Sequence, residues 1–400
     1  MLTADQLLEE LLKRARGLTQ TEAVPVELAL GRVLAQPQVA TISVPPLDNS
    51  AMDGYAVRAA ECAPGALLAV SQRIAAGQVG EALVVGSAAR IFTGAPVPPG
   101  ADAVVMQEHC TLDGDKVRIN HQPKPGENIR RAGEDIRPGN TILAAGTRLD
   151  AAAMGLAASV GLAALPVYRR LKVASFSTGD ELVQPGTALG AGQIYNSNRY
   201  TLAGLVQGLG CEWLDLGSVP DTLAATLVAL QRAAALADVV ITSGGVSVGE
   251  EDHVKAAVEQ LGKIDLWKVA MKPGKPLVYG RVGEADFIGL PGNPVSTFVT
   301  FVLFARPFLL KRMGVVDVLP KTYRVMAAFD WVKPGERREF LRARLVVSAE
   351  GVLQAQLFPN QSSGVLTSAV WADGLVDIDI GRTVTRGEPV RFIPFSEVLG

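Results

Sequence analysis

The chain has 400 residues, which is too many for one ordinary hydrophobic core, and 48% of them are hydrophobic, enough to fill roughly two to four domains. With 38 basic and 40 acidic residues the formal net charge is -2, so no overall positive field favours a nucleic-acid partner. The 3 cysteines have no CxxC spacing, and this sparse, odd number argues against a disulfide framework and fits a reducing cytoplasm.

The first predicted element is an amphipathic helix over residues 3–16, in which Leu7 and Leu11 lie on one face. Thr3 and Gln6 have the spacing of a capping box at the start of this helix. Because the helix lacks the apolar core and cleavage site of a secretory signal, we expect no signal peptide.

The Pro45-Pro46 pair cannot continue a helix and predicts a hinge. Residues 43–136 are rich in Gly, Pro and short alternating apolar runs, so they predict an inserted β-rich subdomain. Residues 137–170 contain an Ala-rich helix, which we expect to pack against the first helix and to form a helical N-terminal subdomain with residues 1–42. This helix gains little from lipid and ends near Gly161, so we do not expect it to cross a membrane.

Residues 171–317 alternate predicted strands and helices, which indicates a three-layer α/β/α domain around a parallel sheet. The predicted strands cover residues 172–176, 213–219, 239–242, 265–269 and 287–290, and the predicted helices cover residues 198–209, 221–235 and 250–261. Asp221 should cap the second helix, and Arg306-Pro307 should break a last helix that follows Pro294, so that it cannot cross a membrane either. Residues 318–400 predict a C-terminal β domain.

Ligands bind outside the carboxyl ends of strands in an open parallel sheet, and three unusual turns follow strands in this domain. The first turn, residues 175–181, carries hydroxyls and two carboxylates, although simple helix capping explains them equally. The second, residues 242–252, is Gly-rich and leads into a helix, a combination that binds phosphate-like anions. Its Asp252 could hold a divalent cation beside a phosphate, or could only complement the helix dipole.

The third turn, residues 290–294, is fixed by two prolines, and its Gly292 permits a close approach of the backbone. The alternative is a merely rigid turn. Lys268, Lys272 and Lys275 precede it among apolar residues, where an anion would neutralise them. Three surface lysines on an edge strand are the other interpretation.

Gly245-Val246-Ser247-Val248-Gly249 matches the G-x-S-x-G nucleophile elbow of serine hydrolases. The one histidine after Ser247 is His253, in the next predicted helix, so the usual triad cannot be assembled. The P-loop motif is absent, and Gly190-Ala191-Gly192 lacks the third glycine of the dinucleotide fingerprint. We therefore expect an anion bound by amides, lysines and a metal, with no covalent protein nucleophile.

Taken together, seven segments resemble those of the molybdopterin molybdenumtransferase (MoeA) family, which is related to the E domain of gephyrin. The segments are residues 48–57, 131–135, 177–182, 195–198, 243–249, 272–276 and 289–296, and they follow the family's order. The C-terminal match is looser, since Ala343 follows Arg342 where the family often has Gly, and residues 360–363 read Asn-Gln-Ser-Ser instead of a His-Gln-Gly-Ser-like run.

The resemblance implies an enzyme that inserts molybdenum from molybdate into adenylylated molybdopterin and releases AMP, with Mg²⁺ as cofactor. It also implies a cytoplasmic, elongated homodimer that contacts the molybdopterin adenylyltransferase and the molybdoenzyme apo-proteins. The expected catalytic residues are Asp53, Asp135, Glu181, Asp221, Lys268 and Lys272. The expected metal ligands are Asp252, Asp221 and Glu181. The turns and the resemblance together give the substrate-binding residues Thr178, Ser243, Gly244, Gly245, Ser247, Gly249, Lys275, Pro291, Gly292, Asn293, Arg342 and Ser363.

In the family, the pocket lies between the central domain of one chain and the first domains of the other, which would bring Asp53 and Asp135 to the partner's pocket. The substrate pyrophosphate would lie on the amides of residues 243–249, and Lys275, Arg342 and Ser363 would hold molybdate. A non-catalytic, gephyrin-like scaffold is the alternative. At every position where the family motifs have an acidic or basic residue this chain also has one, which favours the enzyme. We expect neither a nucleic-acid nor a membrane partner.

Overall fold

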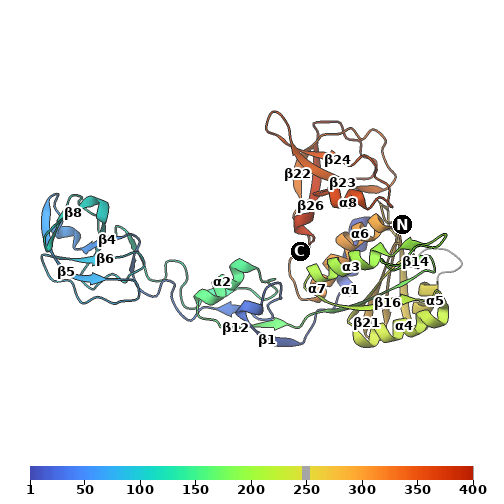
Figure 1. The fold of residues 1–400 in the computed structure, drawn as a ribbon, viewed down its shortest axis with the longest axis horizontal. Coiled ribbons are helices and arrows are strands. Elements are labelled where there is room, and N and C mark those ends of the chain that lie inside the picture. The colour runs from blue at the N-terminus through green and yellow to red at the C-terminus, as the bar shows by residue number, and fades with distance from the viewer. Residues whose placement is uncertain (246–252, 400) are drawn as a thin grey trace.

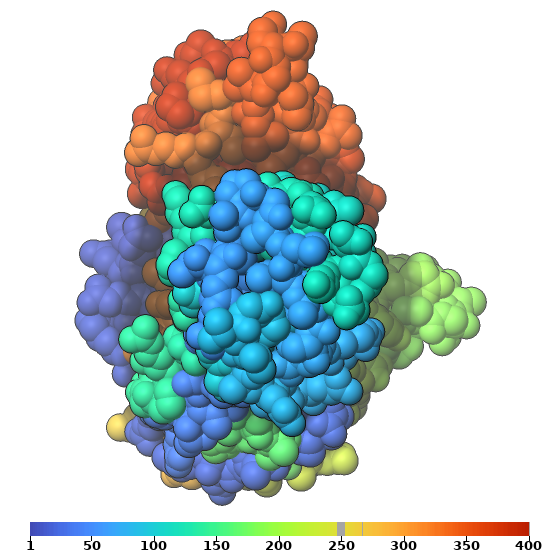
Figure 2. All heavy atoms as spheres, turned by 90° about the vertical axis from the view of Figure 1, so that its left-hand side faces the viewer, coloured from blue at the N-terminus to red at the C-terminus, as the bar shows by residue number. Residues whose placement is uncertain are grey.

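The structure is a computed structural model that describes residues 1–245 and 253–399. The chain is elongated: a small β domain lies at one end, a middle unit that contains α2, β1 and β12 follows, and a narrow connection joins this unit to a central domain that carries the C-terminal domain (Figure 1). Viewed along the long axis, the small β domain lies in front and the C-terminal domain rises above it (Figure 2). The molecule therefore separates its N-terminal third widely from its central sheet.

The central domain is built on a mixed six-stranded sheet with the order β16-β13-β17-β21-β20-β18. The strands are β13 (Lys172–Thr178), β16 (Glu212–Val219), β17 (Val239–Ser243), β18 (Gly262–Lys268), β20 (Pro276–Val282) and β21 (Ala285–Leu290). The first four in this order are parallel, whereas β20 and β18 run antiparallel to their neighbours. The predicted all-parallel sheet is thus wrong, because residues 283 and 284 form a two-residue connection that can join only antiparallel strands.

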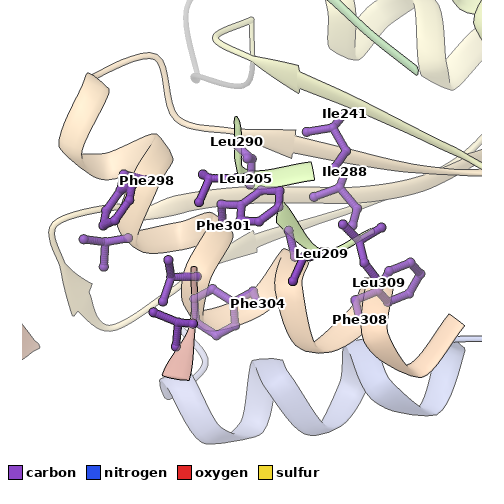
Figure 3. Packing of buried hydrophobic residues seen from close by; sticks show 14 of the residues in the cluster. Leu205, Leu209, Ile241, Ile288, Leu290, Phe298, Phe301, Phe304, Phe308 and Leu309 are labelled. Carbon is purple, nitrogen blue, oxygen red and sulfur yellow. The ribbon is translucent and has the colours of Figure 1, made fainter. Parts of the chain in front are cut away.

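Helices pack on both faces of this sheet, because successive side chains along each strand point to opposite faces. Ile241 and Ile288 join one core cluster with α3 (Ser197–Gly208) and the long helix after residue 293, as Figure 3 shows. Val240 and Phe287 join the cluster on the other face. The helices on that face are α4 (Leu223–Leu236) and α5 (His253–Leu261). Thr222, and not the expected Asp221, caps α4, so the Asp221 carboxylate is not used as a cap.

The long helix runs as α6 (Pro294–Thr300), a π-helical segment (Phe301–Ala305) and α7 (Arg306–Arg312). The predicted break at Arg306-Pro307 is wrong. The Arg306 amide bonds to the Phe301 carbonyl five residues back, and this wider turn accommodates a proline that has no amide hydrogen to donate. Among the described residues this is the one helix with the length and hydropathy of a membrane span, and 83% of that stretch is buried inside the fold.

The first helix, α1 (Ala4–Arg14), has the predicted capping box, in which Thr3 Oγ1 accepts from the Gln6 amide and Gln6 Oε1 accepts from the Thr3 amide. Its buried Leu7 and Leu11 pack into the core cluster of the central domain. The Ala-rich helix α2 (Ala151–Ser159) belongs to a different cluster. The expected packing of these two helices is therefore wrong, because the apolar stripe of α1 is buried against α7 instead.

Residues 18–42 contain short strands and a 3₁₀ helix but no α-helix, and residues 137–170 contain one helix, α2, beside short strands, where a helical subdomain was expected. They pair as β1 (Thr21–Pro25) with β12 (Ala164–Tyr168) and as β2 (Gln38–Val39) with β11 (Thr141–Leu143). Residues 21–25 are too few for a stable helix, and pairing with β12 satisfies their backbone groups instead.

The small β domain contains a six-stranded sheet with the order β7-β4-β6-β5-β9-β8. Its strands are β4 (Gly54–Val57), β5 (Ala66–Ile74), β6 (Ser87–Ile91), β7 (Ala103–Met106), β8 (Cys110–Asp113) and β9 (Lys116–Ile119). A separate two-stranded pair joins β3 (Asn49–Ser50) to β10 (Ile129–Arg130) at the base of this domain.

In the C-terminal domain five strands close into a ring, because β25 pairs with both β26 and β23. The strands are β22 (Tyr323–Ala327), β23 (Arg338–Val347), β24 (Leu353–Leu357), β25 (Gly374–Ile378) and β26 (Pro389–Pro394). A short strand of the central domain, β19 (Met271–Lys272), adds to β23 in parallel. The lysine segment is thereby held between the two domains.

The connection to the N-terminal third is held by an ion pair between Arg169 and Asp238 at the start of the central sheet. The Arg169 guanidinium donates two hydrogen bonds of 2.7 Å to the Asp238 carboxylate, which also accepts from the Lys172 amide. Burial opposes ionisation of Asp238, but the hydrogen bonds from Arg169 and Lys172 outweigh it and lower its pKa below the ordinary value of 3.8.

We expect Asp238→Asn to lower the free energy of unfolding by about 1–3 kcal/mol at neutral pH, because a charge-assisted hydrogen-bond set is lost. Since the folded-state pKa is lower than the unfolded-state value, the stabilisation is present above the ordinary value of 3.8 and is lost as the pH falls through the folded-state pKa. Urea unfolding at neutral and acidic pH checks this, and a difference between the two proteins that stays constant into strong acid would contradict it.

Candidate functional site

The turns that follow β13, β17 and β21 line one cavity of about 570 Å³ at the carboxyl edge of the sheet. The turn after β13 contributes Thr178 and Glu181, and the turn after β17 contributes Gly244 and Gly245. The remaining walls come from the end of β17, from the turn after β21 with the start of α6, and from the residues around the starts of α3 and α4, including Tyr195, Asn196, Asn198, Asp221, Ser243, Gly292, Asn293 and Pro294. The three predicted turns therefore meet in space.

Two of these turns touch through glycines. A Cβ atom on Gly292 would lie 3.6 Å from the Cα of Gly244, so the two backbones are in van der Waals contact. The Gly244 amide donates to the Leu290 carbonyl at 2.9 Å, which continues the pairing of β17 with β21 into the turn. At Gly245 the φ angle is +65° and a Cβ would lie 2.5 Å from Val254, so only glycine fits there.

A side chain that was not among the predicted site residues fixes the third turn. Asn198 Nδ2 donates to the Gly292 carbonyl at 2.7 Å and so ties the start of α3 to the turn after β21. Two residues earlier, Asn196 Oδ1 accepts from the Arg199 amide and caps the same helix. The sequence signal was an Asn at each end of a short polar run before an amphipathic helix, which indicates capping but not the contact with Gly292.

A second cavity of about 600 Å³ adjoins the first and shares Gly244, Gly245, Gly292 and Asn293 with it. Its other walls come from the lysine segment, from the start of α6 and from the C-terminal domain. These residues are Lys272, Pro273, Gly274, Lys275, Pro276, Pro291, Ser296, Arg337, Gln361, Ser362 and Ser363. The site is thus one continuous hollow with two compartments, which we call the glycine compartment and the basic compartment.

The basic compartment carries three cationic side chains. Lys272 Nζ lies 3.3 Å from a carboxylate oxygen of Glu339, whose side chain is 9% exposed. Lys275 and Arg337 make no ion pair within the described part of the chain. Arg337, which sequence reasoning missed, is brought here by the pairing of β19 with the adjacent β23. Two cations without counter-ions, beside serine hydroxyls, suit a small oxyanion.

Two predicted residues lie outside both compartments. Arg342 is fully buried inside the C-terminal domain and does not line the basic compartment, which differs from its expected contact with molybdate. Lys268 is exposed at the end of β18, opposite Pro276, and lines neither cavity. Alternation along a strand was expected to give Lys268 and Lys272 a common face, but β18 ends between them and Lys272 belongs to β19.

Asp53 and Asp135 are also far from the cavities of their own chain. Asp53 directly precedes β4, a strand of the small β domain at the far end of the molecule (Figure 1), and Asp135 lies exposed in the connection that follows β10 in the chain. The amide and hydroxyl of Thr93 donate to Asp53 Oδ1 at 2.7 and 2.8 Å, and these hydrogen bonds lower the pKa of Asp53. The exposed carboxylate is therefore held ionised and in one orientation.

The predicted Ser247, Gly249 and Asp252 lie outside the described residues. Among the residues that are described, no cluster of three His, Cys, Asp or Glu side chains could hold a metal ion. Glu181 and Asp221 nevertheless line the same glycine compartment. Two carboxylates facing one cavity suit Mg²⁺, which usually takes one or two protein carboxylates together with substrate phosphates.

Comparison with known families accounts for almost the whole chain. Residues 2–161 match the family described as "MoeA N-terminal region (domain I and II)". Residues 174–311 match "Probable molybdopterin binding domain", and residues 324–395 match "MoeA C-terminal region (domain IV)".

Individual proteins are similar over the same length. The chain is 41% identical to "Molybdopterin molybdenumtransferase" of Haemophilus influenzae over 404 residues, covering 100% of both proteins. It is 40% identical to "Molybdopterin molybdenumtransferase 2" of Mycobacterium tuberculosis, covering 93% of each. The fold resembles the crystal structure titled molybdopterin biosynthesis moeA protein from Pyrococcus horikoshii OT3, with a TM-score of 0.82 at 28% identity, covering 98% of this chain and 100% of that one.

We expect Gly245→Ala to disrupt the glycine compartment, because an alanine at this φ angle is strained and its Cβ would clash with Val254. The melting temperature should fall, and the affinity for a phosphorylated ligand should fall at least about tenfold, as for the loss of one charge-assisted contact. Gly204→Ala in α3 is the matched control, since a Cβ there meets open space and favours the helix. Equal effects of the two substitutions on calorimetric binding of pyrophosphate would contradict this view of the turn.

Proposed function

We propose that this chain, which belongs to the molybdopterin molybdenumtransferase (MoeA) family, is an enzyme of molybdenum cofactor biosynthesis that inserts molybdenum from molybdate into adenylylated molybdopterin and releases AMP. The observation that carries the proposal is the two-compartment hollow. One compartment offers backbone amides and carboxylates to a pterin nucleotide, and the adjoining one offers cations to an oxyanion. The two substrates would thus meet at the shared residues Gly244 and Asn293.

In the glycine compartment, the substrate pyrophosphate would bind to the turn after β17. The turn begins with Ser243 and Gly244, and its glycines leave the backbone open to close approach by phosphate oxygens. The contacts of Ser247 and Gly249 with the substrate stay predictions, because both residues lie outside the described part of the chain. Thr178 and Asn293 would orient the rest of the substrate, and Pro291 would contact it from the adjoining basic compartment. The helices on both faces of the sheet agree with the three-layer molybdopterin-binding fold that we assign to this domain.

In the basic compartment, molybdate would bind as a tetrahedral dianion. Lys275 and Arg337 supply two positive charges that form no ion pair with the carboxylates of the described residues, and Ser363 supplies a hydroxyl. A guanidinium can donate two parallel hydrogen bonds to an oxyanion. Lys272 forms an ion pair with Glu339. It would neutralise phosphate or pterin charge at the boundary between the compartments. Lys268 would act only from outside this boundary.

We propose Mg²⁺ as the cofactor of the glycine compartment, held by Glu181 and Asp221, with Asp252 as the further expected ligand. When bound, it would neutralise the charge that develops on the phosphates as the bond to AMP breaks. The protein's own contribution is to keep both carboxylates free for this task. Thr222 caps α4, so that the neighbouring Asp221 is left unused by the helix.

We also propose a cytoplasmic homodimer in which Asp53 and Asp135 of one chain complete the hollow of the other. The distance of both residues from the cavities of their own chain supports this arrangement, and so does the elongated shape. Thr93 would keep the Asp53 carboxylate in position for the partner. The product would then pass to molybdoenzyme apo-proteins, and the substrate would come from the molybdopterin adenylyltransferase. A gephyrin-like scaffold is the disfavoured alternative, because the full-length relatives are named as enzymes.

The direct assay incubates the protein with adenylylated molybdopterin, molybdate and Mg²⁺ and measures AMP. Lys275→Met should lower AMP release at limiting molybdate by about ten- to hundredfold, since one charge-assisted contact is worth roughly 1.5–3 kcal/mol. Glu181→Gln should raise the Mg²⁺ concentration needed for half-maximal rate. Lys321→Met is the control, because Lys321 is an exposed lysine that lines neither compartment. Failure of the unaltered protein to release AMP would reject the proposed function.

The dimer arrangement predicts complementation between two inactive variants. Asp53→Asn removes the carboxylate that one chain contributes to the site of its partner. Lys272→Met removes a cation that lines the hollow of its own chain. When the two proteins are unfolded together and refolded at equal amounts, half of the dimers are mixed and each mixed dimer has one intact site, so about a quarter of the sites should work. If both residues act within one chain, every mixed dimer carries two damaged sites and no activity returns.

A further inference from the structure

The small β domain holds one exposed carboxylate, that of Asp53, in a fixed position. Asp53 directly precedes β4, and Thr93 donates its amide and its hydroxyl to Asp53 Oδ1 at 2.7 and 2.8 Å. These two hydrogen bonds orient the side chain relative to Thr93. They do not fix the backbone of the turn from which the side chain projects, so the direction of the carboxylate also depends on what holds that backbone.

The side chain of Arg90, on the neighbouring strand β6, binds this turn. Arg90 Nη1 donates to the Gly54 carbonyl at 2.9 Å, and Arg90 Nη2 donates to Gln107 Oε1 at 2.7 Å. The Gln107 amide in turn donates to the backbone carbonyl of Asp53 at 3.0 Å. Arg90 is therefore bonded both to the residue that follows Asp53 and to the residue that binds the Asp53 backbone.

Aromatic rings hold the guanidinium of Arg90 in turn. It lies 5.3 Å from the ring centroid of the buried Tyr55 and 4.6 Å from that of Phe92. Two hydrogen bonds and two ring contacts restrict the arginine to one arrangement. In the part of the chain that the structure describes, no carboxylate forms an ion pair with Arg90. Its charge lowers the pKa of Asp53, in addition to the larger effect of the Thr93 hydrogen bonds.

Arg73 provides a comparison within the same sheet. It lies directly opposite Arg90 in the register of β5 with β6, and its guanidinium lies 4.5 Å from the centroid of the same Phe92 ring. Among the described residues it makes no hydrogen bond or ion pair with the turn that carries Asp53. The two arginines thus share a face of the sheet and an aromatic neighbour, and only Arg90 is bonded to the turn.

We infer that Arg90 is a positioning residue for the reaction: it holds the turn of residues 53 and 54 so that the Asp53 carboxylate enters the hollow of the partner chain in one orientation. This inference rests on the proposed function, in which Asp53 completes the site of the partner. Arg90 acts through the Gly54 carbonyl and through Gln107, and not by contact with the substrate.

The amide of Thr93 reports the position of Asp53 without any need for activity, because it donates directly to Asp53 Oδ1. Selective isotopic labelling of threonine makes its hydrogen exchange measurable by NMR at neutral pH, and the signal is assigned by its loss in Thr93→Ser. The variants to compare are Arg90→Met, Gln107→Ala and the matched control Arg73→Met.

We expect Arg90→Met to speed exchange of the Thr93 amide about tenfold and to lower AMP release about tenfold, as for one lost charge-assisted hydrogen bond. Gln107→Ala keeps the backbone amide that binds Asp53, so it should change both in the same direction by a smaller factor. It also serves as the test if Arg90→Met does not fold. Arg73→Met should change neither.

Mixed dimers show in which chain Arg90 acts. When Arg90→Met is refolded with Lys272→Met, about a quarter of the sites should work, as for Asp53→Asn refolded with Lys272→Met. When Arg90→Met is refolded with Asp53→Asn, no activity should return, because neither chain then offers its partner a correctly placed carboxylate.

Unchanged exchange of the Thr93 amide in Arg90→Met, or in Gln107→Ala should the first variant not fold, would overturn the inference even if AMP release fell. The arginine would then act without moving the carboxylate. The inference would also be overturned if Lys272→Met restored activity to Asp53→Asn but not to Arg90→Met. Either result leaves the proposed function intact, whereas an unaltered protein that releases no AMP would reject the proposed function itself.

Discussion

The contact between Gly244 and Gly292 is the constraint on which the arrangement of the site depends. Two neighbouring parallel strands, β17 and β21, end at the same height, and their turns leave the sheet in van der Waals contact. A Cβ at either position would lie at ordinary van der Waals distance from the other turn, but the φ of +89° at Gly244 is a conformation that residues with a Cβ rarely adopt. Because both residues are glycines, the two compartments open on either side of one shared ridge of backbone, which brings a nucleotide-like ligand and an oxyanion within reach of each other.

Much of this could be predicted from the sequence where local rules decide the structure. The capping box of Thr3 and Gln6, the strands before the three turns and the β texture of the flanking regions all follow from short-range patterns. The convergence of the turns followed from the rule that parallel strands end at a common edge. The family match followed from motifs that lie mostly in those same turns.

What the sequence did not reveal depends on pairing and packing at long range. The hairpin of β20 and β21 was missed because no strand was predicted between the lysine segment and residue 287. The location of Arg337 follows from the pairing of β19 with β23, more than sixty residues apart in the chain. Likewise, nothing local separates the buried Arg342 from the cavity-lining Arg337, because both occur in one polar stretch and burial is decided by the ring of strands around them.

The strand β19 has one further consequence. It belongs in sequence to the central domain, yet it is hydrogen-bonded to the rim of the C-terminal ring of strands. A chimera that exchanged residues 318–400 with those of a distant relative would therefore have to match the Met271–Lys272 segment to a foreign β23. In such a hybrid both parts could fold normally. The position of the lysines would then depend on whether Met271 and Lys272 still pair with the foreign β23.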